Sequence, residues 1–255
     1  MRKFITILFW FAVNSSIAQQ QYTSSSIFAH NDYAKPVPLQ TAYNLQVGFI
    51  EADVFLRGEE LLVAHTRFQL DKTKTLDKLY LEPLSTLIAA NQGFIYPDQG
   101  KSLTLMIDLK TDGVETINLL IIKLKKYPLL LSCKTFQVTI SGNVPDPVHW
   151  KNYPDFIHFD GRPTIVYTPD QLARVSLISD SFKNYSHWNG KGDLESDDLK
   201  KITKTIQHVH AKGKQIRFWA IPDFTDAWMK LMELQVDVLN TDHVPELSSF
   251  LKSKK

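Results

Sequence analysis

The stretch that decides the fold is residues 48–54, which read Gly-Phe-Ile-Glu-Ala-Asp-Val. Its apolar residues form a nearly continuous run, as in strands that are covered on both faces. Two carboxylates, Glu51 and Asp53, interrupt this run. Charged groups in such a place cost free energy unless they are paired or bind a metal. Because residues two apart on a strand point the same way, the stretch predicts a buried strand with both carboxylates on one face.

Short apolar runs of the same kind recur along the chain, and helical patterns lie between many of them. The runs are residues 26–30, 60–65, 103–108, 135–140, 156–160, 175–179, 215–220 and 236–240. The helical patterns are residues 39–45, 84–91, 113–126, 196–212 and 225–234. We expect the fourth helix to start with a capping box at Ser196 and to stop at Gly213. Strands that alternate with helices indicate a parallel sheet.

With residues 48–54 the chain has one strand candidate more than an eight-stranded barrel needs. We expect residues 61–65 to form a hairpin-like excursion after the second strand, linked through residues 57–59. An open doubly wound sheet would alternate in the same way. However, Ala-His-Asn-Asp at residues 29–32 stands where that fold has a glycine-rich phosphate fingerprint. The pattern therefore favours a (β/α)8 TIM barrel of the α/β class, in one domain over residues 19–255.

Composition and charge narrow the possible partners. The 255 residues are 44% hydrophobic and 22% charged, with a formal net charge of +2. This balance argues against a nucleic-acid partner or an anionic membrane surface, and we expect a monomer. Cys133 is the single cysteine, so it cannot form an internal disulfide or a cysteine metal cluster. We expect it to be a small buried hydrophobic residue.

The N-terminus has the pattern of a secretory signal peptide. Arg2 and Lys3 precede an apolar run at residues 4–13, and small residues at positions 15–18 end with Ala18. The run is too short to span a bilayer stably, and the alternative is a buried N-terminal helix. The pattern predicts a signal peptide over residues 1–18 and a secreted or periplasmic protein.

The carboxylates define a candidate metal site. Glu51 and Asp53 share one strand face, and Asp108 closes the run at residues 103–108. The carboxyl ends of barrel strands form the functional face, where three converging carboxylates repel one another unless a cation lies between them. Oxygen ligands favour one hard divalent cation, Mg²⁺ or Ca²⁺. The alternative is that individual carboxylates cap helices or pair with Lys110.

Other polar residues accompany this site. His30 and His65 close two neighbouring strand segments, and imidazole can give and take protons near neutral pH. Lys110 follows Asp108 by two residues, and a cation there would stabilise developing phosphoryl charge. Trp219 ends the seventh barrel strand, where it either walls the site or packs in the core.

These motifs resemble the superfamily of glycerophosphodiester phosphodiesterases and phosphatidylinositol-specific phospholipases C, which also includes the phospholipase D toxins. The matching segments are residues 29–33, 50–54, 63–65, 107–111 and 236–242. The resemblance implies a barrel of the phospholipase C type with His30 and His65 as the catalytic pair. It further implies Glu51, Asp53 and Asp108 as metal ligands and Lys110 near the phosphate.

Within this superfamily, His-Asn-Asp-Tyr at residues 30–33 together with residues 79–84 is closest to a particular branch. That branch contains bacterial secreted proteins and a fungal mitochondrial-inheritance protein. Glycerophosphodiesterases usually have His-Arg-Gly at the first motif, so Asn31 occupies the arginine position and is a candidate phosphate or substrate contact. The arginine contact is lost unless Arg162 or Arg217 replaces it. Asp108, where glycerophosphodiesterases usually have Glu, is closer to the toxins, but their cysteine-stapled loop is replaced by residues 66–68.

The residues and the resemblance together predict a metal-dependent phosphoric diester hydrolase with a role in lipid metabolism. We expect it to act on a small glycerophosphodiester or phospholipid-like substrate by acid–base catalysis with two histidines. Two alternatives are a glycoside hydrolase on the same barrel, with Glu51 and another carboxylate as acid and base, and a catalytically inactive binding barrel. The adjacent positions of Glu51 and Asp53 suit joint metal ligation better than flanking a sugar bond.

The signal peptide gives a direct test. We expect the exported protein to lack residues 1–18, because the apolar run and the small residues that follow it form a cleavage site after Ala18. Mass spectrometry of the secreted protein should find 255 − 18 = 237 residues. An intact Met1 on exported protein would contradict the prediction.

Overall fold

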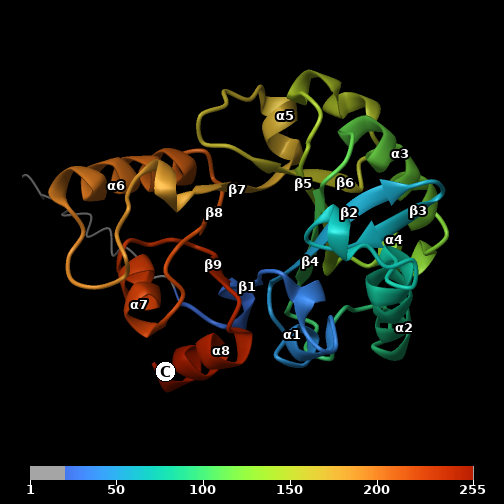
Figure 1. Cartoon of the computed structure of the whole chain (residues 1–255), viewed down its shortest axis with the longest axis horizontal. Helices are drawn as coiled ribbons and strands as arrows, with labels where there is room; N and C mark the ends of the chain where they lie inside the picture. The colour runs from blue at the N-terminus through green and yellow to red at the C-terminus, as the bar shows by residue number, and fades with distance from the viewer. Residues whose placement is uncertain (1–20, 255) are drawn as a thin grey trace, which may run out of the picture.

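A ring of parallel strands forms the centre of the molecule in the computed structural model, which describes residues 21–254 (Figure 1). Neighbouring strands pair in the order β8-β7-β6-β5-β4-β2-β1-β9. The ring closes where Arg217 in β8 bridges to Val238 just before β9, with the Val238 amide donating to the Ile216 carbonyl over 3.2 Å. The predicted eight-stranded barrel is confirmed. The strands are β1 (Ile27–Ala29), β2 (Phe49–Arg57), β4 (Leu103–Leu109), β5 (Phe136–Gly142), β6 (Ile157–Gly161), β7 (Val175–Ser181), β8 (Ile216–Trp219) and β9 (Leu239–Thr241).

One strand lies outside the ring. β3 (Glu60–Val63) pairs antiparallel with β2, with Val54 opposite Val63 and Arg57 opposite Glu60. Gly58 has a φ of +60°, a conformation that glycine adopts without a side-chain clash, and allows the tight turn between the two strands. The expected hairpin is confirmed, and it returns the chain so that His65 follows β3 beside the end of β2.

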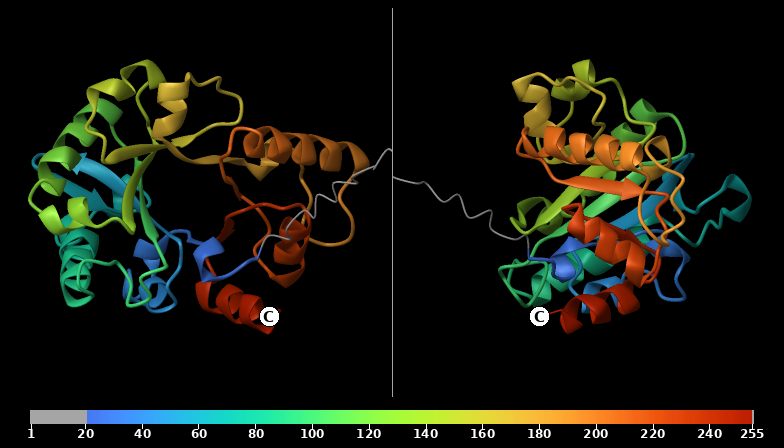
Figure 2. Two further views of the ribbon diagram at one scale, coloured as in Figure 1. Left: turned by 180° about the vertical axis from the view of Figure 1, so that it is seen from behind. Right: turned by 90° about the vertical axis from the view of Figure 1, so that its left-hand side faces the viewer.

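Helices cover the outer face of the ring (Figures 1 and 2). The expected capping box at Ser196 is wrong. Glu195 holds the N-cap position without a side-chain hydrogen bond, and Ser196 is already helical, so its hydroxyl cannot cap the first turn. Gly213, with a φ of +66°, follows the end of that helix as expected. The helices are α1 (Gln40–Asn44), α2 (Glu82–Ala90), α3 (Gly113–Leu124), α4 (Pro128–Ser132), α5 (Pro169–Arg174), α6 (Ser196–His210), α7 (Thr225–Glu233) and α8 (Val244–Ser253).

The predicted signal peptide lies outside the described residues. Among residues 21–254, no helix is long and apolar enough to cross a membrane. Cys133 is buried, as expected.

The barrel interior is layered. A small apolar cluster, separate from the main core, contains Phe28, Phe49, Met106 and Leu177 from four strands and Val238 from just before β9. Polar residues lie two positions further along those strands, and because strand side chains alternate they share the inward face. Thus Phe49 is followed by Glu51, Met106 by Asp108 and Phe28 by His30. The apolar cluster closes the bottom of the barrel, and polar groups gather above it at the carboxyl ends of the strands.

Candidate active site

Three carboxylates meet at the mouth of the barrel, as predicted. β2 supplies Glu51 and Asp53, and the strand register places Asp53 directly beside Asp108 of β4. One oxygen from each residue lies within 4.8 Å of the others. Glu51 and Asp53 are buried, with 5% and 2% of their surfaces exposed. An oxygen-only set with this spacing fits a hard divalent cation.

Two cations balance part of this negative charge. The Lys110 ammonium lies 2.7 Å from Asp108 Oδ1 and 3.0 Å from Asp53 Oδ2. Arg217 Nη2 lies 3.7 Å from Glu51 Oε1 from within the barrel. Burial raises the pKa of Glu51 above its usual range, although the charges of Arg217 and His30 oppose this. Three carboxylates and two fixed cations leave the cluster with a net negative charge. A bound divalent cation would make this net charge positive, so that the cluster could then bind an anion.

His30 follows β1 and is held by its Nδ1 atom. This nitrogen lies 3.0 Å from Asp242 Oδ1, and Nε2 lies 3.6 Å from Glu51 Oε2. Burial alone lowers the pKa of His30, but the hydrogen bond to Asp242 and the charge of Glu51 outweigh it, so the pKa is raised. Sequence reasoning placed Asp242 in a matching motif without giving it a role. The available signal was a carboxylate directly after the last barrel strand.

His65 is joined to the carboxylates through Tyr33, which the sequence analysis also missed. The Tyr33 hydroxyl lies 2.7 Å from Asp53 Oδ2 and 3.1 Å from His65 Nδ1, and His65 Nδ1 is 3.3 Å from Asp53 Oδ2. Burial, followed by the charge of Asp53, raises the pKa of Tyr33, so the phenol stays a donor. The His65 side chain is 60% exposed, so the rest of its ring is open to a ligand.

Asn31 makes the turn that brings these groups together. Its φ of 49° and ψ of 36° lie in the left-handed region, which asparagine tolerates better than most residues. Its backbone N–H donates to Glu51 Oε2 over 3.1 Å, and its side-chain oxygen lies 2.7 Å from the Tyr33 hydroxyl. Its side-chain nitrogen lies 2.9 Å from His30 Nδ1. Asn31 therefore organises the site, and its contact with phosphate or substrate stays a prediction.

The next residue anchors this turn from below. Asp32 is buried, and its Oδ2 accepts hydrogen bonds from the Leu39 amide at 2.6 Å and from the Tyr80 hydroxyl at 2.8 Å. Leu39 has a φ of 68°, which is unusual for a bulky residue and is held by this bond. Burial raises the pKa of Asp32 despite both donors. The segments at residues 30–33 and 79–84, which the sequence analysis combined only as motifs of one branch, are thus in direct contact.

The two arginines that could replace the missing motif arginine differ in position. Arg217 is buried, its guanidinium 3.5 Å from the centre of the Phe28 ring, so it serves Glu51 and not a ligand in solution. Arg162 is partly exposed and is held by Asp160 at 2.6 Å. Its guanidinium lies 5.1 Å from the centre of the Trp219 ring, which is half-buried between both arginines. Arg162 and Trp219 thus contact each other at the carboxyl ends of β6 and β8, and the predicted role of Trp219 in the site stays a prediction.

Comparisons with known proteins agree with this geometry. Residues 17–129, which include both histidines, the three carboxylates and Lys110, match the family model of the AIM6-like phosphodiesterase domain. The chain is 27% identical to the altered inheritance of mitochondria protein 6 homolog of Arthroderma benhamiae, over 86% of this chain and 81% of that protein. It is 26% identical to altered inheritance of mitochondria protein 6 of Eremothecium gossypii, over 88% and 69%.

The fold is shared with a solved structure, a glycerophosphodiester phosphodiesterase from Parabacteroides distasonis. The TM-score is 0.57 at 14% identity, covering 91% of this chain and 98% of that one. At this identity the likeness concerns the fold. The predicted resemblance is confirmed in that a phosphodiesterase family model matches residues 17–129 and the solved structure shares the fold.

The Asp32–Tyr80 contact gives a stability prediction. Tyr80→Phe removes a donor from a buried carboxylate, which typically costs about 1–3 kcal/mol in the free energy of unfolding. Urea unfolding measures the effect. Tyr153→Phe is the matched control, because the described residues offer its hydroxyl no hydrogen-bond partner, and its effect should stay below about 0.5 kcal/mol. Equal losses in both variants would contradict the anchoring role of Asp32.

Proposed function

We propose that this protein is a secreted, metal-dependent phosphodiesterase that hydrolyses a small phosphodiester by acid–base catalysis with His30 and His65. One observation carries the proposal: two histidines, each oriented through Nδ1, flank a cluster of three carboxylates that share a mouth with Lys110. A glycerophosphodiester or a phospholipid-like molecule is the substrate class we favour. The name of the Parabacteroides structural neighbour supports the former.

The histidines divide the proton transfers. In each ring Nδ1 is occupied, by Asp242 for His30 and by Tyr33 and Asp53 for His65. Nε2 is therefore the atom that exchanges a proton with the substrate in both residues. One ring deprotonates the attacking water or substrate hydroxyl, and the other protonates the leaving oxygen. Asp242 and Tyr33 act as positioning residues, because they fix the rings and not the phosphate.

The charged groups stabilise the phosphoryl oxygens. Glu51, Asp53 and Asp108 would hold one Mg²⁺ or Ca²⁺, which polarises a non-bridging phosphate oxygen when it is bound. Lys110 lies against two of these carboxylates, with its side chain 29% exposed, and can contact a second oxygen. Arg162 supplies a further cation at the rim. Fixed donors of this kind stabilise charge that develops in the transition state.

The geometry disfavours both alternatives. Glycosidase carboxylates stand about 5–9.5 Å apart on either side of a sugar bond. Here one oxygen each of Glu51, Asp53 and Asp108 lies within 4.8 Å of the others, a spacing that suits joint ligation of one cation better. A barrel that had lost turnover would have no need to orient His30 through Asp242 or His65 through Tyr33.

The metal site can be tested without turnover. Glu51→Ala, Asp53→Ala and Asp108→Ala should each weaken Mg²⁺ and Ca²⁺ binding in calorimetry by at least about tenfold, because each removes one oxygen ligand. Asp226→Asn, an exposed carboxylate in α7, should bind as wild type. Chelation should abolish hydrolysis of bis(p-nitrophenyl) phosphate, and added metal should restore it. Unchanged metal binding in Glu51→Ala would contradict the proposed metal site.

The histidine pair is tested by kinetics. His30→Ala and His65→Ala should each lower kcat on the same diester by at least about 10²-fold, since general acid or base catalysis contributes about 10²–10⁴-fold. The double variant should lose much less than the product of the two losses, because the residues act as one unit. His208→Ala in α6 is the control. A near-wild-type kcat in His65→Ala, with unfolding unchanged, would leave the mechanism without its second catalyst.

A further inference from the structure

Asp242 holds the ring of His30 from an exposed position. The Asp242 side chain is 47% exposed, so packing alone does not keep its carboxylate against Nδ1 of His30. Polar contacts with the backbone of Asp242 fix this residue instead. The Lys35 ammonium donates to the Asp242 carbonyl over 2.7 Å, and the Asp242 amide donates to Asp223 Oδ2 over 2.7 Å. The place of the carboxylate that orients His30 is therefore set by residues outside the catalytic pair.

Asp223 fixes the backbone at the end of β9. Besides the Asp242 amide, its Oδ2 accepts from the Thr241 hydroxyl over 3.1 Å. The same hydroxyl accepts from the His243 amide over 2.8 Å. The Thr241 carbonyl accepts from the backbone amide of His30 over 3.0 Å. Asp223 therefore holds the stretch of chain that contacts both the backbone and the ring of His30.

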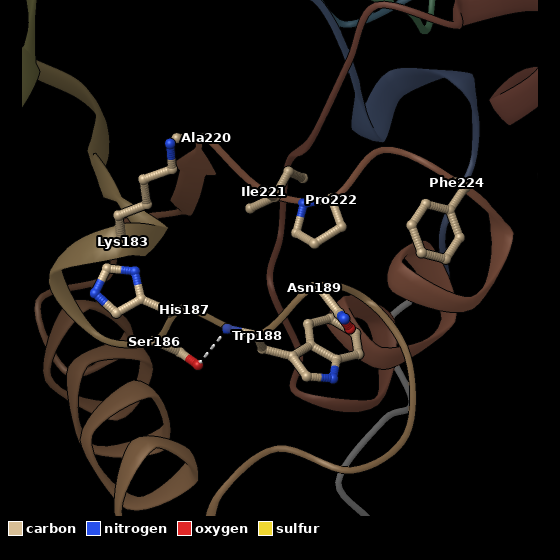
Figure 3. Close-up of a pocket in the computed structure, with 9 residues that line it drawn as sticks. All are labelled: Lys183, Ser186, His187, Trp188, Asn189, Ala220, Ile221, Pro222 and Phe224. Carbon is tan, nitrogen blue, oxygen red and sulfur yellow. Dashed lines mark hydrogen bonds between the residues drawn. The ribbon is translucent and has the colours of Figure 1, made fainter.

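Asp223 is itself held in place. Its Oδ1 accepts from the indole N–H of Trp228 in α7 over 2.8 Å, and only 3% of Trp228 is exposed. Its two neighbours, Pro222 and Phe224, line the cavity drawn in Figure 3. Both pack closely against Gly190, where a Cβ would lie 2.8 Å from Pro222 Cβ and 2.3 Å from Phe224 Cζ. The Asp223 carboxylate is thus an acceptor fixed by its surroundings.

The contacts of Asp223 require a carboxylate. Three donors converge on its two oxygens, and an ionised carboxylate, which only accepts, satisfies all of them. An asparagine would turn an NH₂ group toward either the Trp228 indole N–H or the Asp242 amide. Capping of α7 does not explain the residue, because Phe224 holds the N-cap position of that helix.

We propose that Asp223 is a positioning residue of the proposed active site, which holds the backbone of Asp242 so that its carboxylate stays against His30. The inference rests on the proposed function, because it assigns His30 to catalysis. A displacement of about 1 Å in a catalytic group can cost about 10²-fold in rate. Asp223 acts on the ring and not on the phosphate or the carboxylate cluster, so its loss should lower kcat and leave KM and metal affinity unchanged.

The contact is tested first by NMR, independently of turnover. A ring N–H bonded to a carboxylate exchanges slowly with water and gives a downfield proton signal, because such charge-assisted hydrogen bonds are strong. Wild type should show this signal for Nδ1 of His30, and His30→Ala and Asp242→Ala should lack it. Asp223→Asn should also lose it. Asp226→Asn, the same change at an exposed position in α7, is the matched control and should keep it.

Two NMR results would overturn the proposal. One is a His30 signal that survives in Asp223→Asn, and the other is a wild type without any signal that depends on Asp242. If Asp223→Asn does not unfold cooperatively, Trp228→Phe takes its place, since it removes only the donor to Oδ1. Trp228→Phe should broaden the His30 signal, and an unchanged signal would contradict the positioning role.

Turnover of bis(p-nitrophenyl) phosphate is the second readout. Asp223→Asn should lower kcat by about tenfold or more and leave KM within about twofold of wild type. In an Asp242→Ala background the same change should alter kcat by less than about twofold, because Asp223 acts through Asp242. An equal loss in both backgrounds would indicate a merely structural role and overturn the proposal. If wild type hydrolyses no diester while the His30 signal still depends on Asp223, the proposed function fails and the positioning contact stands.

Discussion

The burial of Glu51 and Asp53 inside the mouth of the barrel is the constraint on which the rest of the site depends. Two carboxylates with 5% and 2% of their surfaces exposed would repel one another and lose their hydration. Four neighbours offset this cost: Lys110 and Arg217 bring positive charge, and Tyr33 and the Asn31 amide donate hydrogen bonds. The remaining negative charge, open toward the barrel mouth, is what makes the cluster suited to a divalent cation.

Each of the four residues that follow β1 makes a different contact at the mouth of the barrel. His30 faces Glu51, and Asn31 adopts the left-handed turn that points its amide at the same carboxylate. Asp32 accepts a hydrogen bond from the Tyr80 hydroxyl, and the Tyr33 hydroxyl contacts Asp53 and His65. A turn of this kind can hold its geometry only if its middle is anchored. The buried contact between Asp32 and Tyr80 supplies that anchor, and it links the active site to the segment before α2.

Because position 31 is an asparagine, the arginines near the carboxylates come from other parts of the barrel. Arg217 takes a buried place over Phe28, where it offsets Glu51, and Arg162 stands at the rim against Trp219. Arg217 in β8 therefore neutralises a carboxylate of the cluster, whereas Arg162, which directly follows β6, pairs with Asp160.

The sequence by itself determined the barrel, the hairpin after the second strand and the three converging carboxylates. These follow from local rules, since strand alternation and chain order place Glu51, Asp53 and Asp108 on one face at one end of a parallel sheet. It also pointed to both histidines, because each closes an apolar run. The sequence prediction failed at the first turn of α6, where Ser196 is a suitable residue type for an N-cap but stands one residue inside the helix.

Only the tertiary structure decided that Asp242 holds His30, that Tyr33 joins His65 to Asp53 and that Asp32 pairs with Tyr80. These partners are separated by up to 212 residues in the chain. Their contacts depend on barrel closure and on turn geometry, to which no periodic pattern in the sequence corresponds.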